Sequence, residues 1–195
     1  MGPIVVQTPR LRLRTWEPSD ASDFMRLAAD PEVVRYISGG VPYEPSQVGL
    51  FVQRQLDTQR ERGWSRWAVE LVDPPDDAAR GVVGFCGPGC TFAPEVELGW
   101  WLLRSLWNQG LATEAARAAL DHSFREIGFP YLICCVHREN AASLRVAEKV
   151  GFERVREFEF NGLPLIRHEL HNSHTKTDRP ESAEAARYCL DCAGA

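Results

Sequence analysis

Hydrophobic and polar positions follow two different periods along this chain, which predict strands in some segments and helices in others. Residues 10–14 alternate strictly between arginine and leucine, which is typical of a strand with one buried face. Residues 46–62 are mostly polar, with apolar residues three or four positions apart, which indicates an amphipathic helix. Similar patterns predict strands at 66–72, 81–86, 96–103, 131–136, 154–160 and 163–170, and helices at 18–29, 32–37, 109–127 and 140–150.

The order of these segments predicts a mixed α+β fold. The helix at 109–127 lies between the strands at 96–103 and 131–136, and a crossover of this length joins parallel strands. Polar turns join other strands, and one of them, Asn161-Gly162, is a strong hairpin signal. We therefore expect a mostly antiparallel central sheet of about seven strands with one parallel pair, flanked by helices.

Composition predicts a turn and a tail outside these segments. The Gly-Pro-Gly run at 87–89 is expected to be a turn, because no helix follows it directly as one would in a dinucleotide-binding loop. From residue 172 onward the chain becomes polar. We predict one folded domain over residues 1–171 and a linker or tail over 172–195, in which residues 181–190 could form a short helix docking on the body or on a second subunit of a homodimer.

Length and charge narrow the class of protein. A chain of 195 residues with 44% hydrophobic and 25% charged residues is typical of one globular domain. The net charge of −5 gives no reason to expect nucleic acid as a partner. No apolar run reaches the length of a membrane span and no signal peptide is visible, so we expect no membrane association and a cytoplasmic location.

The six cysteines are expected to be free thiols, because nothing in the sequence directs the chain to an oxidising compartment. Two of them lie in an apolar segment at 131–136, where cysteine behaves as a small hydrophobic residue. A four-thiolate zinc site is the alternative for the other four, but they are split between a predicted strand and the tail. We therefore expect no metal site; the four are Cys86, Cys90, Cys189 and Cys192.

The stretch from Trp107 to Ala116 joins a predicted strand to a predicted helix, with Gly110 at the helix entrance. Such an entrance directs unpaired backbone N–H groups and the positive end of the helix dipole at one point, which favours an anion. Gly110 and Ala112 let a ligand approach the backbone closely. No Lys or Arg lies within this stretch, so the main-chain amides themselves would have to hold a phosphate.

This stretch resembles the acyl-CoA diphosphate loop of the GNAT superfamily of N-acetyltransferases. Gly110 and Ala112 match its small positions, whereas Trp107 stands where the family usually has Gln or Arg. Trp followed by Gly-Leu-Ala-Thr-Glu-Ala is similar to the branch of ribosomal-protein alanine N-acetyltransferases, which acetylate protein N-termini. The runs at 8–14 and 140–152 resemble the family's opening and closing signatures, so the resemblance covers nearly the whole predicted domain.

The resemblance implies the GNAT fold and the transfer of an acetyl group from acetyl-CoA to a primary amine by direct attack on the thioester. It also implies that Asn140, at a helix start where it can serve as an N-cap, touches the acetyl-CoA arm. The backbone of the preceding strand would pair with pantetheine. The expected cofactor-binding residues are Leu102, Leu103, Trp107, Asn108, Gln109, Gly110, Leu111, Ala112, Thr113, Asn140 and Ser143.

Glu97 and Ser143 are the candidate catalytic residues. Glu95 and Glu97 share one strand face, and a neighbouring charge with partial burial raises a carboxyl pKa and makes a better base. Glu97 falls where this branch commonly has a Glu, and we expect it to act as the base through a water. The resemblance gives Ser143 the protonation of the departing thiolate. The alternatives are solvated strand residues for the two glutamates and a helix-surface residue for Ser143.

The acceptor is an amine that the sequence does not identify. The resemblance favours a protein N-terminal α-amine, and a small-molecule amine of the aminoglycoside kind is the alternative. In this fold, residues 32–37 and 46–62 and the final hairpin would wall the acceptor pocket. A catalytically silent acyl-CoA-binding module is the alternative from another class, and the presence of both Glu97 and Ser143 argues against it.

Overall fold

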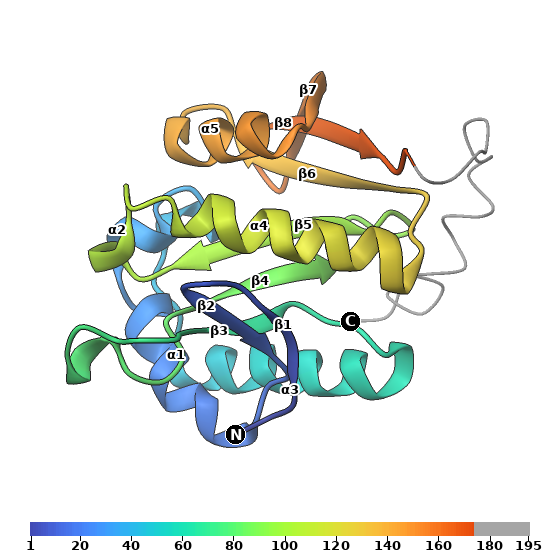
Figure 1. The fold of residues 1–195 in the computed structure, drawn as a ribbon. Coiled ribbons are helices and arrows are strands. Elements are labelled where there is room, and N and C mark those ends of the chain that lie inside the picture. The colour runs from blue at the N-terminus through green and yellow to red at the C-terminus, as the bar shows by residue number, and fades with distance from the viewer. Residues whose placement is uncertain (174–195) are drawn as a thin grey trace.

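The computed structural model of the protein describes residues 1–173. One eight-stranded sheet, in the order β1-β2-β3-β4-β5-β6-β8-β7, has helices on both faces (Figure 1). The strands are β1 (Ile4–Gln7), β2 (Leu11–Arg14), β3 (Trp67–Leu71), β4 (Gly84–Gly89), β5 (Glu97–Leu102), β6 (Tyr131–His137), β7 (Glu153–Phe160) and β8 (Leu163–His171). The α-helices are α1 (Ala21–Ala28), α2 (Pro31–Val34), α3 (Pro45–Arg62), α4 (Leu111–His122) and α5 (Ala141–Val150).

The predicted mixed fold is confirmed, with one parallel pair in an otherwise antiparallel sheet. Strands β5 and β6 are the parallel pair, and the other neighbouring strands are antiparallel. The strand that the sequence analysis missed is β1, which pairs with β2 at the edge of the sheet. Its residues, Ile-Val-Val-Gln, show no alternation, so only the contact with β2 identifies the segment as a strand.

The prediction of a turn at residues 87–89 was wrong. These residues complete β4, where Gly87 pairs with Gly99 and Gly89 pairs with Glu97 of β5. A Cβ atom at Gly89 would lie 2.6 Å from the guanidinium carbon of Arg66, far inside van der Waals contact. The lack of a side chain therefore makes room for Arg66 on the sheet, and the chain does not turn there.

Two hydrophobic clusters lie on opposite faces of the sheet. Helices α4 and α5 pack on one face, where Trp67 and Leu98 are buried. Helices α1 and α3 pack on the other face, where Ala68 and Phe85 are buried. Because successive residues of a strand point to opposite faces, Trp67 and Ala68 belong to different clusters. The sheet is thus covered on both sides (Figure 1).

A buried ion-pair network joins α1 to the sheet. The Arg14 guanidinium donates to Asp20 at 2.7 and 2.8 Å and to Glu70 at 2.8 and 2.6 Å. Burial acts to lower the Arg14 pKa, but the hydrogen bonds to Asp20 and Glu70 outweigh it and raise that pKa. We expected the arginines of residues 10–14 to face solvent. Arg14 is instead buried.

The last described residues belong to the body of the domain. Asn172 is buried, its N–H donates to the Pro130 carbonyl at 2.9 Å, and its side-chain amide donates to the carbonyls of Phe124 and Phe129, each at 3.1 Å. The helix predicted at 181–190 lies outside the described residues. Within residues 1–173, no helix combines the length and apolar character needed to cross a membrane.

Candidate active site

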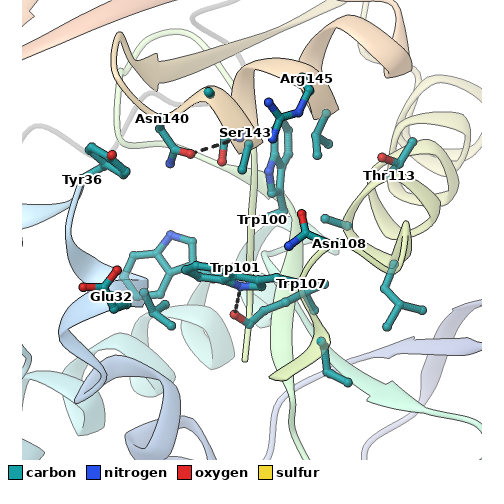
Figure 2. Close-up of a pocket in the computed structure, with 18 of the residues that line it drawn as sticks. Glu32, Tyr36, Trp100, Trp101, Trp107, Asn108, Thr113, Asn140, Ser143 and Arg145 are labelled. Carbon is teal, nitrogen blue, oxygen red and sulfur yellow. Dashed lines mark hydrogen bonds between the residues drawn. The ribbon is translucent and has the colours of Figure 1, made fainter. Parts of the chain in front are cut away.

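The sheet opens between its two parallel strands. Strand β5 has six register pairs with β4 but one with β6, between Glu97 and Ile133. Because the two strands are parallel, the helices that follow them, α4 and α5, both begin at the same end of the opening. A cavity of about 560 Å³ lies there, bounded by the end of β5, the starts of α4 and α5, and residues of α2 and the segment after it (Figure 2).

Gly110 is the N-cap of α4, as the sequence predicts. Its φ of +77° lies in the left-handed region, where glycine is favoured. The nearest atom to a Cβ built there would be Nη2 of Arg10, at 3.7 Å, so the helix entrance is open. The first N–H groups of α4 have no partners inside the helix, an arrangement that favours an anion, and residues 110–113 line the cavity.

Trp107 is the departure from the family pattern, and the structure gives it a local role. Its indole N–H donates to the Leu102 carbonyl at 2.9 Å, which ties the loop to the end of β5. Figure 2 shows the ring beside Trp101 at one wall of the cavity. An indole in this position therefore fixes the approach to Gly110 instead of offering a charge.

The structure brings most of the predicted cofactor-binding residues together. Two do not line the cavity: the N–H of Leu103 donates to the Val83 carbonyl at 2.9 Å, and the side chain of Gln109 donates to the Ser105 carbonyl at 2.9 Å. The residues that do line it are Leu102, Trp107, Asn108, Gly110, Leu111, Ala112, Thr113, Asn140 and Ser143.

Asn140 and Ser143 meet at the start of α5. The Oδ1 atom of Asn140 accepts from the N–H of Ser143 at 3.1 Å, which confirms the predicted N-cap. Both residues line the cavity, and Figure 2 shows them on the wall that faces Trp101. The cap therefore orients Asn140 and Ser143 toward the same space.

Helix α5 also supplies the positive charge that the α4 loop lacks. Arg145 and Lys149 line the cavity and are four residues apart, so they share one helix face. The sequence analysis did not single out Lys149; the spacing from Arg145 was the signal that could have found it. Phosphates at the entrance of α4 would thus meet cations from a helix far along the chain.

The carboxylate of Glu97 is engaged within the protein. It is buried, forms an ion pair with Arg66, and accepts from the Thr91 hydroxyl at 2.7 Å. Glu95 forms its own ion pair, with Arg167. The expected mutual repulsion of the two carboxylates is thus offset by two arginines. Glu97 is not among the residues that line the described cavity.

Comparison with known proteins gives this arrangement a family. The model of the GNAT acetyltransferase domain matches residues 10–153. The chain belongs to the GNAT acetyltransferase family. An uncharacterised protein of Bacillus subtilis, YkkB, is 34% identical over 74% of this acetyltransferase and 82% of YkkB, and the uncharacterised N-acetyltransferase p20 of Bacillus licheniformis is 28% identical over 75% and 81%.

Solved structures share the acetyltransferase fold. A GNAT-family acetyltransferase of Bacillus anthracis superposes with a TM-score of 0.71 at 25% identity, over 86% of this chain and 98% of that one. RimL, a ribosomal α-N-protein acetyltransferase in complex with coenzyme A, superposes with a TM-score of 0.70 at 16% identity, over 87% and 98%. The spermidine N-acetyltransferase of Vibrio cholerae, with CoA and spermine, gives 0.66 at 20% identity, over 85% and 98%. At these last two identities the likeness extends to the fold alone.

The acetyltransferase cavity continues past Ser143 to α2 and the residues after it. Glu32 and Tyr36, from the segment 32–37 that was expected to wall the acceptor pocket, line this end of the cavity. The Tyr36 ring lies 5.0 Å from that of His137 and so bridges the opening to the end of β6. No residue of helix α3 or of the β7–β8 hairpin lines this cavity, although both were expected to wall the acceptor pocket.

The cysteines that the structure describes were considered as possible metal ligands. Within residues 1–173, no group of three or more His, Cys, Asp or Glu side chains is placed to hold a metal ion. Burial raises the pKa of Cys86 and of Cys134, which keeps both as thiols. Cys189 and Cys192, the other half of the alternative zinc site, lie outside the described residues.

Proposed function

We propose that this GNAT enzyme transfers an acetyl group from acetyl-CoA to a primary amine by direct attack on the thioester. One observation carries the proposal. A single cavity joins the open entrance of α4 to Asn140 and Ser143 at the start of α5, at the place where β5 and β6 separate. Such a cavity can hold a diphosphate at one end and bring a thioester to the gap in the sheet.

We assign the donor to the α4 and α5 side. The amides of residues 110–113 would bind the diphosphate, and Arg145 and Lys149 would neutralise its phosphates. Asn140 would contact the acetyl-bearing arm, and Ser143 would donate its hydroxyl proton to the thiolate as it leaves. The backbone groups at the end of β5, where β6 no longer pairs, would bind pantetheine.

The state of Glu97 favours an α-amine as acceptor. The buried Glu97 carboxylate is held by Arg66 and by the Thr91 hydroxyl, so it is not free to take a proton from the amine directly. An α-amine, with a pKa of about 8, is already about one-tenth neutral at pH 7, whereas a lysine amine, near 10.4, is almost entirely protonated. We therefore propose a protein N-terminal α-amine as the acceptor, with Glu97 acting through a water.

A small-molecule amine is the second candidate, since acidic and aromatic side chains line the α2 end of the cavity. Thiol release from acetyl-CoA, measured with N-terminal peptides, polyamines and aminoglycosides, tests both. We expect turnover with at least one class and a higher melting temperature in saturating acetyl-CoA. Absence of CoA binding would contradict the proposal, and tight binding without turnover would identify a silent acyl-CoA-binding module.

The base is tested with Glu97→Gln. We expect kcat/KM to fall about 100-fold at pH 7, at the lower end of the effect of general base catalysis. The loss should shrink at pH 9, because a larger fraction of the amine is then neutral without help. A loss that is independent of pH would show that Glu97 supports Arg66 and β5 and does not receive the proton.

A further inference from the structure

The two ends of the cavity differ in the charged side chains that line them. Arg145 and Lys149 line the side formed by α5, next to the entrance of α4. Glu32 lines the other end, together with Arg35 and two aromatic rings, those of Tyr36 and Trp101. Figure 2 shows Glu32 and Tyr36 on the side opposite Thr113 and Arg145. An anion is thus favoured at the first end, whereas the carboxylate and the two rings at the other end can attract a cation.

A cation of the protein already lies at the acidic end. Nη1 of Arg35 is 3.7 Å from Oε2 of Glu32, and its guanidinium carbon is 5.4 Å from the centre of the Tyr36 ring. The separation from Glu32 is longer than a hydrogen bond, and both side chains are exposed, so the pair is weak. The carboxylate and the ring therefore accept positive charge, and a ligand can displace the one that is there.

Glu32 differs in this respect from Glu97. The Glu97 carboxylate is buried and held by Arg66 and Thr91, and so is not available to an incoming cation. Glu32 faces the cavity, and among residues 1–173 its carboxylate has only the loose contact with Arg35. The nearby Trp101 ring is held in place by Phe85, at 5.2 Å between centroids, so it offers a fixed surface.

We propose that Glu32, with the rings of Tyr36 and Trp101, binds a second positive charge on the acceptor, beyond the amine that is acetylated. This inference rests on the proposed function and narrows its acceptor to amines that carry another ammonium or guanidinium group. Two sources have this chemistry: a small diamine, and a peptide N-terminus followed by a basic side chain. The acidic end distinguishes acceptors by charge, and the reaction at the thioester is unchanged.

Two matched pairs of acceptors test the inference. The first pair is 1,4-diaminobutane and 4-amino-1-butanol, in which a hydroxyl replaces the second ammonium. The second pair is the tripeptide amides Ser-Lys-Ala and Ser-norleucine-Ala, which differ by one charge. The preference, taken as the ratio of kcat/KM for the charged to the uncharged member, is measured for the wild type and three variants. The pair that shows the larger preference identifies the source of the second charge.

Glu32→Gln should reduce that preference about fivefold, mainly through KM, as expected for a partly exposed charge pair. Arg35→Gln should raise it about twofold, because the competing cation is removed. Glu61→Gln makes the same chemical change on α3, at an exposed residue that does not line the cavity, and should leave the preference unchanged. The affinity for CoA should be equal in all four proteins.

CoA binding tests the proposed function, and the preference between acceptors tests the inference, so the two can fail separately. A protein that does not bind CoA contradicts the function. A protein that acetylates both members of each pair equally well, or keeps its preference in Glu32→Gln, overturns the inference alone. Calorimetry of 1,4-diaminobutane and the lysine tripeptide with the CoA complex gives a readout without turnover. Equal binding to the wild type and Glu32→Gln, or none to either, would also overturn the inference.

Discussion

The two edges of strand β5 show how this protein separates stability from function. Along β4, β5 is paired in register from Leu102 to Glu97, and rings such as Phe85 and Trp101 pack across the two strands. Along β6, the pairing stops after Glu97 and Ile133. The same strand is thus part of a continuous ladder on one side and one wall of a cavity on the other. The cavity thus lies where β5 and β6 no longer pair.

The charged groups follow the same division. Arg14, away from the opening, is fully enclosed and hydrogen-bonded to Asp20 and Glu70. Arg66, on the segment before β3, is paired with Glu97 at the start of β5, but its buried Nε has no hydrogen-bond partner among the described residues. The first network is complete and the second is not. We therefore expect substitutions on the closed side to change the free energy of unfolding, and those at the opening to change binding or turnover.

The largest effect is expected from Arg14→Met. Removal of the guanidinium leaves the buried carboxylates of Asp20 and Glu70 without their cation, which costs about 3–5 kcal/mol of unfolding free energy. Urea unfolding measures the loss, and calorimetry below the transition should show an unchanged Kd for CoA. Arg80→Met, which removes an exposed arginine paired with Asp77, should change stability by less than about 0.5 kcal/mol. A large change in CoA affinity for Arg14→Met would break the division between the two sides.

Gly110→Trp should have the next largest effect, on binding. The indole would fill the entrance of α4 and should weaken CoA at least about 100-fold, which corresponds to about 2.7 kcal/mol. Gly128→Trp is the matched control. Gly128 also has a positive φ, has open space around it, lies at the far end of the same helical segment and does not line the cavity. Comparable CoA affinity in the two variants would refute the assignment of the α4 entrance.

Ser143→Ala should lower kcat about tenfold with little change in the Kd for CoA. The expected effect is moderate because a thiol has a pKa near 8.5 and its thiolate leaves without much help. Single-turnover measurements with acetyl-CoA separate the chemical step from product release. The plain alternative of a helix-surface serine predicts no change in that step.

The smallest effect concerns the link between α4 and the start of β2. Burial acts to raise the Glu114 pKa, but the hydrogen bonds from Thr8, at 2.6 Å, and Arg10 outweigh it and lower that pKa. The resulting stability is present above the unfolded-state pKa of about 4.3 and is lost as the pH falls through the folded-state value. Glu114→Gln should therefore cost about 1 kcal/mol at pH 7, and this cost should fall as the pH drops below the folded-state pKa. A cost that stays constant over this range, in urea unfolding, would contradict the ionic origin.

The sequence predicted those parts of the fold whose conformation depends on residues close together in the chain. The alternation in β2, the Asn161-Gly162 hairpin and the caps at Gly110 and Asn140 all depend on residues close together in the chain. These predictions are confirmed because few other conformations satisfy such residues.

Features that depend on distant partners could not be predicted in this way. Nothing near Glu97 indicates that Arg66, on the segment before β3, neutralises it. The glycines at the end of β4 suggested a turn, but glycine is needed there because Arg66, from the segment before β3, occupies the space of a side chain. The position of Glu32, on which its proposed role rests, likewise becomes visible only when α2 is seen at the cavity.

A crystal structure of the protein with bound coenzyme A tests the central claim most directly. The account predicts diphosphate oxygens at about 3 Å from the amides of residues 110–113 and the pantetheine arm between β5 and β6. A diphosphate bound elsewhere, or an opening closed by further pairing of β5 with β6, would contradict it.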